Sequence, residues 1–323
     1  KSPNKRVMQG DGQTQTAGLF ATTATGAVIK AGGLDSFTVT LEIELKVDKP
    51  EAAQSFADRN GRGSKKNKNL VARYDTASAL ATLRERAIVG TVFEKGMADG
   101  RTTGTSETAT TNIVDLSTME QMLLNAVAGG RFKPEHIKHY QVSALEPYAH
   151  EFLELLDRNF AGQWLERTPE NSDQFRRLYV HGWPYALKAL APAYYETRRD
   201  VLAPIGDAIA GSLKDEHDSS DDAKNSFEAA IADTSNDYPT PEVDLAELER
   251  RLEKIDWHRY RKHWIAITGA KIDKETGKRK RRELKSGEIV VDAKSENTAA
   301  VIGAVKNKIL SDTWTDLTSQ ENA

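Results

Sequence analysis

A short glycine turn near the start of the chain is the sharpest candidate for chemistry. It reads Asp11-Gly12-Gln13 and runs into residues of helical character. A glycine turn that leads into a helix points backbone N–H groups at the space above it, and the helix dipole favours an anion there. Gln13 both donates and accepts hydrogen bonds, and Asp11 could hold Mg²⁺ or orient a water molecule. The pattern predicts a phosphate site, with an everyday Asp-Gly turn as the alternative.

A second candidate is Asp58-Arg59-Asn60 with the basic loop that follows it. Its cations are Arg59, Arg62, Lys65, Lys66, Lys68 and, just beyond the loop, Arg73. Such a concentration of positive charge suits the phosphates of DNA or of a nucleotide. The alternative is a solvated loop, but the Asn and Gly residues between the cations leave backbone N–H groups approachable.

The third candidate is the segment 270–287, which has eight Lys or Arg residues against three Asp or Glu, around a Lys-Glu-Thr-Gly-Lys turn. Its densest run is Lys278, Arg279, Lys280, Arg281 and Arg282. We expect an exposed basic hairpin without a function of its own, and the functional alternative is contact with nucleic acid. The segment has no aromatic residue to stack on bases, so recognition of single strands is not supported.

Composition and spacing exclude several other kinds of site. The chain has no cysteine, which removes disulfides, thiolate zinc sites, iron–sulfur clusters and cysteine nucleophiles. The seven histidines do not converge by spacing, and His136 and His139 share at most one helical face. No nucleophile elbow marks a Ser-His-Asp hydrolase.

The elements that must position these residues begin with an alternating run at 37–45, the clearest strand. Helices are predicted at about 14–23, 50–58, 75–89, 117–128, 245–255 and 295–311. Ser117 with Glu120 forms a capping box at the start of the fourth, and Gly129-Gly130 ends it. Residues 145–213 read as helical throughout, with an apolar stripe that is interrupted near Pro184.

Apolar stripes in this middle region predict a packed core and not a cofactor box. One stripe is Phe152, Leu153, Leu155, Leu156, Phe160 and Trp164, and the other is Phe175, Leu178, Tyr179, Ala186, Leu187 and Leu190. A polar Thr- and Gly-rich segment at about 96–112 and an acidic linker at 214–222 separate three predicted regions: 1–113, 114–213 and 214–323.

The whole-chain composition is that of a protein with a real core and a well-solvated surface. The chain has 323 residues, 38% of them hydrophobic and 29% charged, with a formal net charge of −3. No apolar stretch is long enough for a membrane helix, and no signal sequence opens the chain. The absence of cysteine fits a cytoplasmic protein. Because only a stub of strand precedes the Asp-Gly-Gln turn, we expect further strand residues upstream of Lys1.

The order of these motifs resembles the DGQHR-domain, or DndB-like, family of DNA-modification systems. The resemblance rests on Asp11-Gly-Gln-Thr-Gln15, the alternating strand, Phe56-Ala-Asp-Arg-Asn60, the segment Leu70-Val-Ala-Arg-Tyr-Asp75, and Leu252-Glu-Lys-Ile-Asp-Trp257. It implies an α+β fold, with a small ParB/sulfiredoxin-like mixed sheet near the N-terminus followed by a mainly helical region. The family's His and Arg after Asp-Gly-Gln are Thr14 and Gln15 here.

The resemblance also implies that the protein binds duplex DNA, binds or hydrolyses ATP with Mg²⁺, and works with other proteins of a phosphorothioation or deazaguanine system. Asp11, Gln13 and Asp58 would then be catalytic, with Asp11 on the metal. Phosphate would be bound by Gly12, Thr14, Gln15, Asn60, Arg59 and Arg73. Without the family's Arg, a charge has to come from Arg6, Arg59 or Arg73. The alternatives are a non-catalytic DNA-binding regulator of the modification operon and a scaffold that recruits modifying enzymes.

Overall fold

The computed structural model describes residues 77–95, 97–98, 113–165, 175, 178–214, 219–233, 237–284, 286–311 and 314, together with Glu51 and Gln54. The chain divides into two compact units, Lys1–Thr76 and Ala77–Ala323, and nearly all described residues belong to the second. The predicted region boundaries at 113/114 and 213/214 both fall within this second unit.

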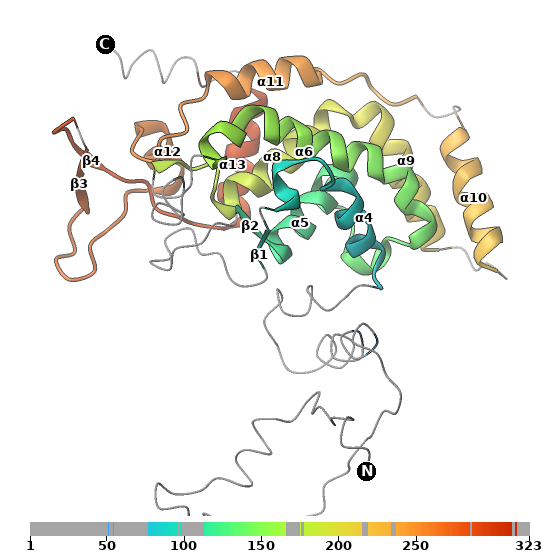
Figure 1. The fold of residues 1–323 in the computed structure, drawn as a ribbon. Helices are drawn as coiled ribbons and strands as arrows, with labels where there is room; N and C mark the ends of the chain where they lie inside the picture. The colour runs from blue at the N-terminus through green and yellow to red at the C-terminus, as the bar shows by residue number, and fades with distance from the viewer. Residues whose placement is uncertain are drawn as a thin grey trace, which may run out of the picture. The chain divides into compact units, whose positions relative to one another are not determined.

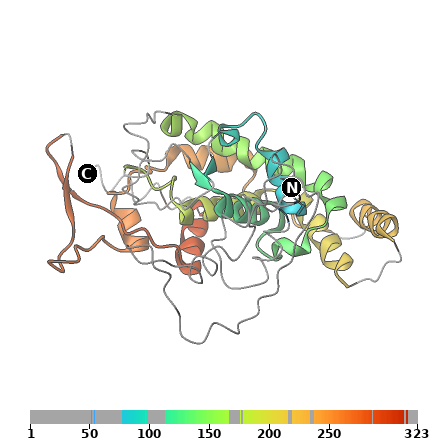
Figure 2. The same ribbon diagram turned by 60° about the horizontal axis from the view of Figure 1, so that its bottom comes forward.

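The second unit is α+β and mainly helical (Figure 1 and Figure 2). Its elements are α4 (Ala79–Ala87), η2 (Val92–Glu94), β1 (Met97–Ala98), β2 (Val114–Asp115), α5 (Leu116–Ala128), η3 (Pro134–His136), η4 (His139–Gln141), α6 (Val142–Leu165), α8 (Pro184–Thr197), α9 (Arg199–Ser212), α10 (Ser220–Ala232), α11 (Leu245–Lys254), α12 (Lys262–Thr268), β3 (Arg281–Glu283), β4 (Ile289–Val291) and α13 (Ala299–Leu310). The predicted helices at 75–89, 245–255 and 295–311 are confirmed as α4, α11 and α13.

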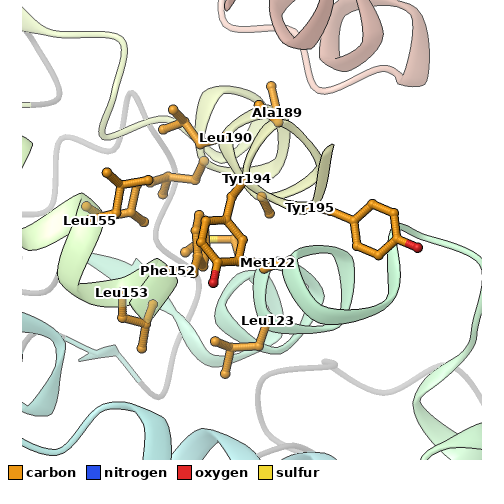
Figure 3. Close-up of a cluster of buried hydrophobic side chains, with 14 of the residues drawn as sticks. Met122, Leu123, Phe152, Leu153, Leu155, Ala189, Leu190, Tyr194 and Tyr195 are labelled. Carbon is orange, nitrogen blue, oxygen red and sulfur yellow. The ribbon is translucent and has the colours of Figure 1, made fainter. Parts of the chain in front are cut away.

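Helix α5 lies at the centre of the core. It is apolar on nearly all sides, and a helix of that kind has to be surrounded by other elements. Helices α4, α6, α8 and α9 pack against it. Figure 3 shows Met122 and Leu123 of α5 in one cluster with Phe152 and Leu153 of α6 and Tyr194 of α8. One continuous core therefore joins α5 to the predicted helical stretch 145–213 and to α4.

The apolar stripes are confirmed as core. All six members of the first stripe are buried in α6, and the ring of Phe93 packs edge-on against Trp164 at 5.3 Å between centroids. In the second stripe Phe175, Ala186, Leu187 and Leu190 are buried, whereas Leu178 and Tyr179 are partly exposed.

The predicted start of α5 is wrong. The N-cap is Asp115, whose carboxylate accepts hydrogen bonds from the backbone N–H of Thr118 at 2.8 Å and from its hydroxyl at 3.1 Å. Asp caps as well as Ser does, and Asp115 ends strand β2 just before the helix. Glu120 was expected to complete a capping box with Ser117, but its carboxylate accepts a hydrogen bond from the buried guanidinium of Arg84 at 2.6 Å. The predicted end at Gly129 is confirmed.

Pro184 begins a helix and does not interrupt one. Proline is preorganised for the first helical turn, where its missing N–H group is not needed. The residues before it leave the helical conformation to pair with a distant segment: the N–H of Val180 donates to the carbonyl of Trp257 at 2.8 Å, and Tyr179 forms a bridge with His258. Residues 145–213 are therefore not helical throughout.

Two helices, α10 and α12, were not predicted from the sequence. Helix α10 begins at Ser220, inside the predicted acidic linker at 214–222.

The described strands form two small sheets. In the first, β1 and β2 are parallel, with Met97 opposite Val114. In the second, β3 and β4 are antiparallel, with Arg282 opposite Val290. The predicted strand at 37–45 and the helix at 14–23 lie outside the described residues, while Glu51 and Gln54 of the predicted helix at 50–58 are helical. Among the described helices, none is both long and apolar enough to cross a membrane.

Candidate nucleic-acid interface

The predicted basic hairpin is confirmed as an arm that leaves the helical body after α12. We call residues 269–284 and 286–294 the basic arm. In both views it extends away from the helices, on the side opposite α10 (Figure 1 and Figure 2). The five cations predicted from the sequence in this segment all belong to it.

Two turns fold the basic arm back on itself. At the first, the carboxylate of Asp273 accepts hydrogen bonds from the backbone N–H groups two and three residues later, at 3.0 and 2.9 Å. The turn closes at Gly277, whose φ of +66° is the left-handed conformation that glycine adopts without strain. At the second turn the N–H of Leu284 donates to the carbonyl of Glu288 at 2.8 Å.

Three backbone segments meet at the base of the arm. The N–H of Lys271 donates to the carbonyl of Asp292 at 2.8 Å, and the N–H of Lys280 donates to the carbonyl of Lys271 at 2.8 Å. Bridges join Ala270 with Ala293 and Ile272 with Arg279. Lys271 and Lys280 are therefore directly opposite each other across a ladder, with Asp292 beside them.

The strand geometry divides the predicted cations between two faces. Neighbouring side chains along a strand point to opposite faces, so Arg279 and Arg281 lie on one face while Lys280 and Arg282 lie on the other. Residues 278–281 are exposed, and within the described part of the chain their side chains have no carboxylate partner within 4.0 Å. Arg282 is half-buried. The arm thus presents an outer basic face of Arg279 and Arg281.

The inner face rests on a buried ion-pair cluster. Asp292 accepts from the Nε and a terminal nitrogen of Arg282 at 3.1 and 2.9 Å, and it lies 3.2 Å from a terminal nitrogen of Arg259. Arg259 and Asp292 are both buried, and the guanidinium of Arg259 lies 5.1 Å from the ring centroid of Trp183. The sequence did not reveal Arg259 or Asp292 as site residues, because they belong to separate segments that only the fold brings together.

Among the described residues of this cluster, cationic side chains outnumber carboxylates. Burial lowers the pKa of Arg259, the charge of Asp292 opposes that shift, and the charge of Arg282 adds to it. Burial likewise lowers the pKa of Lys271, and the charges of Arg259 and Lys280 lower it further. We call Lys271, Lys280, Arg282, Arg259 and Asp292 the arm root.

The Ile-Asp-Trp segment anchors the arm to the helical body. The carboxylate of Asp256 accepts from His258 Nδ1 and from Arg261 Nε, each at 2.6 Å. Its backbone carbonyl accepts from the indole of Trp264 at 2.8 Å and lies 2.9 Å from His263 Nε2. Burial acts to raise the pKa of Asp256, but the hydrogen bonds from the side chain and the backbone N–H of His258, with the charges of His258 and Arg261, outweigh it and hold the pKa at about 2. The motif therefore has a structural role next to the arm.

The other predicted site residues lie outside the described residues. These are Asp11, Gly12, Gln13, Thr14, Gln15, Asp58, Arg59, Asn60, Arg62, Lys65, Lys66, Lys68 and Arg73. His136 and His139 belong to separate 3-10 turns, η3 and η4. Within the described part of the chain, no group of three or more His, Asp or Glu residues is placed to hold a metal ion.

A shallow pocket beside α9 is a weaker candidate than the arm. Its lining includes Arg131, Asp207 and Tyr238. Arg131 donates to Asp207 at 2.8 Å, and the Tyr238 hydroxyl donates to the same carboxylate at 2.8 Å. Because these groups satisfy one another, the pocket offers no clear surplus of charge or hydrogen-bonding capacity to a ligand.

Comparisons with known proteins identify no relative. No protein-family model, no curated protein and no solved structure matches this chain. The resemblance to the DGQHR-domain family therefore stays a prediction, and the candidate site rests on the geometry of the basic arm.

Proposed function

We propose that this chain binds duplex DNA through its basic arm and serves a DNA-modification system. The observation that carries the proposal is the outer basic face of Arg279 and Arg281 on a two-stranded ribbon. The major groove of B-DNA is wide enough to admit such a ribbon, and Lys or Arg side chains along it neutralise phosphates. The motif order that resembles the DGQHR-domain family supports modification, by phosphorothioation or of the deazaguanine type, as the process served.

We further propose a nucleotide-dependent role, in which ATP with Mg²⁺ is bound or hydrolysed at the Asp-Gly-Gln turn. In this proposal Asp11 holds the metal, Gly12 and Gln13 bind phosphate, and Asp58 and Asn60 complete the site within a ParB/sulfiredoxin-like core. The support is the sequence pattern alone. Other proteins of the modification system are the expected partners, in the cytoplasm.

The alternative is a non-catalytic DNA-binding regulator of the modification operon, and ATP turnover separates the two. We would measure turnover with Mg²⁺, with and without duplex DNA, in the parent and in Asp11→Ala. Turnover that vanishes in the variant supports the nucleotide-dependent role. If neither protein turns over ATP and both bind DNA, the regulator is the better description.

DNA binding itself is tested by neutralising the outer basic face. In Arg279→Gln/Arg281→Gln the affinity for a short duplex should fall, and the slope of log K against log salt should flatten by about two, because about two fewer counterions are released. Fluorescence anisotropy over a salt series measures both quantities.

The matched control removes the same charge at the other end of the unit. Lys214→Gln/Lys224→Gln alters two exposed lysines, one just after α9 and one in α10, the helix on the side opposite the arm in both views (Figure 1 and Figure 2). This control should keep the parent slope. Equal losses in the two double variants would refute the arm as the DNA contact, because the effect would then depend only on net charge.

A further inference from the structure

Among the described residues, the arm root gathers four cationic side chains around one carboxylate. Both oxygens of Asp292 are already used, one by Arg282 alone and the other by Arg282 together with Arg259. Among the described residues, the ammonium groups of Lys271 and Lys280 have no carboxylate within 4.0 Å. The backbone hydrogen bond between these two lysines holds their side chains next to each other despite the like charge.

Lys271, one of the two lysines, is half-buried, so its charge is costly without an anion, whereas Lys280 is exposed. Asp292 and Arg259 are both less than a tenth exposed, and burial, followed by the charges of Arg259 and Lys280, lowers the pKa of Lys271. Like charges in a partly dry site are screened little by water. An oxyanion placed between the two lysines would reverse the repulsion.

A buried hydroxyl provides a second, independent observation. Tyr185, the second residue of α8, is fully buried, and its hydroxyl has no hydrogen-bond partner in the part of the chain that the structure describes. Its ring packs edge-on against Trp183 at 5.7 Å between centroids, and the guanidinium of Arg259 lies over the Trp183 ring. A buried polar group without a partner is unusual in a folded protein and indicates a place for a ligand atom or a water molecule.

We propose that the arm root is a binding site for a single phosphate group. Lys271 and Lys280 would contact the phosphate oxygens directly, Arg282 would contribute from the same face, and Arg259 would add buried charge behind them. The inference rests on the proposed function in naming the source, a phosphodiester of the DNA that the arm holds. A free phosphate ester has the same chemistry and is separated from DNA by the test.

The test follows the side-chain NMR signals of the lysines in the full chain. Inorganic phosphate and a short duplex are titrated separately at low salt, and each should shift the Nζ and Cε signals of Lys271 and Lys280 in a saturable way. Lys271→Gln should weaken phosphate binding by about tenfold, the usual effect of removing one charge-assisted hydrogen bond. Lys274→Gln, an exposed lysine in the first turn of the same arm, should stay within about twofold of the parent.

A second variant guards against a purely structural effect. Asp292→Asn removes the carboxylate that competes with the phosphate, so phosphate should raise the Tm of this variant more than that of the parent. A structural role for Asp292 alone predicts an equal or smaller gain. An equal or smaller gain would overturn the proposal.

The outcomes separate the two proposals. Phosphate binding without duplex binding would refute DNA as the partner while the phosphate site stands, with a free ester as its source. Duplex binding with no response of Lys271 and Lys280 to either titrant would leave the DNA contact and remove the phosphate site. Equal effects of Lys271→Gln and Lys274→Gln on phosphate binding would also overturn it.

Discussion

At the scale of single residues, His181 shows how burial decides a protonation state. Its Nδ1 accepts a hydrogen bond from the indole N–H of Trp164 at 3.0 Å, so the ring carries its proton on Nε2. The ring stacks on Phe160 and on Tyr179, with centroid distances of 4.7 and 5.0 Å. Burial, and to a lesser extent the charge of His258, lowers the pKa of His181 from 6.5 to about 3. The folded protein therefore holds this histidine neutral.

This histidine predicts a loss of stability in mild acid. Below pH 6.5 the unfolded chain takes up a proton that the folded chain excludes, so the free energy of unfolding falls as the pH falls, until about pH 3. The contribution between pH 7 and pH 5 is about 2 kcal/mol. His181→Asn keeps an acceptor for Trp164 but cannot titrate, so its stability should depend less on pH by that amount. Urea unfolding at the two pH values measures the difference, and equal dependence in parent and variant would contradict the assignment.

The sequence alone could not have shown that His181 is buried in the core and held neutral. Trp164 was recognised as core from its place in an apolar stripe at helical spacing. His181 lies in the non-helical stretch before Pro184, where the backbone pairs with residues near Trp257. Periodicity describes neighbours within one element, whereas this contact joins two elements across a loop.

At the scale of elements, the ends of helices were harder to predict than their existence. Helix α5 was expected from its capping signals, yet its first residue was missed because Asp115 and Ser117 are both good caps by residue type. Its end was clear because Gly129 and Gly130 are adjacent, and both adopt positive φ, +62° and +75°. A cap with two chemically suitable candidates is decided by tertiary contacts, here the pairing of Glu120 with Arg84.

These two glycines give a matched test of what the end of α5 requires. Gly129→Ala and Gly130→Ala both force a side chain into the left-handed conformation, which costs about 1 kcal/mol. Only at Gly129 would the new Cβ also lie 2.8 Å from the ring of Tyr195, a buried residue of α8 that projects away from Tyr194 (Figure 3). Gly129→Ala should therefore destabilise the fold by a further 1–3 kcal/mol or so.

Thermal or urea unfolding of the two glycine variants beside the parent measures this difference. Gly130 is the control, because the nearest atom to its added Cβ is Asn125 Oδ1, at an ordinary 3.6 Å. Equal destabilisation at both positions would mean that the Tyr195 ring moves freely out of the way. The close approach would then have no part in the choice of glycine.

At the scale of the whole molecule, single helices and turns were easier to predict from the sequence than the domains to which they belong. The acidic stretch at 214–222 was taken as a boundary, yet the continuous core runs from Leu80 of α4 to Val305 of α13. Boundary prediction relies on local composition, whereas α11 and α13 pack against α8 through apolar faces that are far apart in the chain. The basic arm was predicted correctly as a hairpin because its turn residues are close together in the sequence. The arm root was not predicted, because its residues come from separate segments that only the fold brings together.

The division at Thr76 and Ala77 separates the two proposed activities and so gives a last prediction. A polypeptide of residues 77–323 contains the described core and the complete arm, so it should unfold cooperatively and bind a short duplex with nearly the parent's salt dependence. It lacks the Asp-Gly-Gln turn and the basic loop, so it should not turn over ATP. Folded 77–323 that fails to bind DNA would place the DNA contact in the loop that follows Asp58, and turnover of ATP by this polypeptide would remove Asp11 from the mechanism.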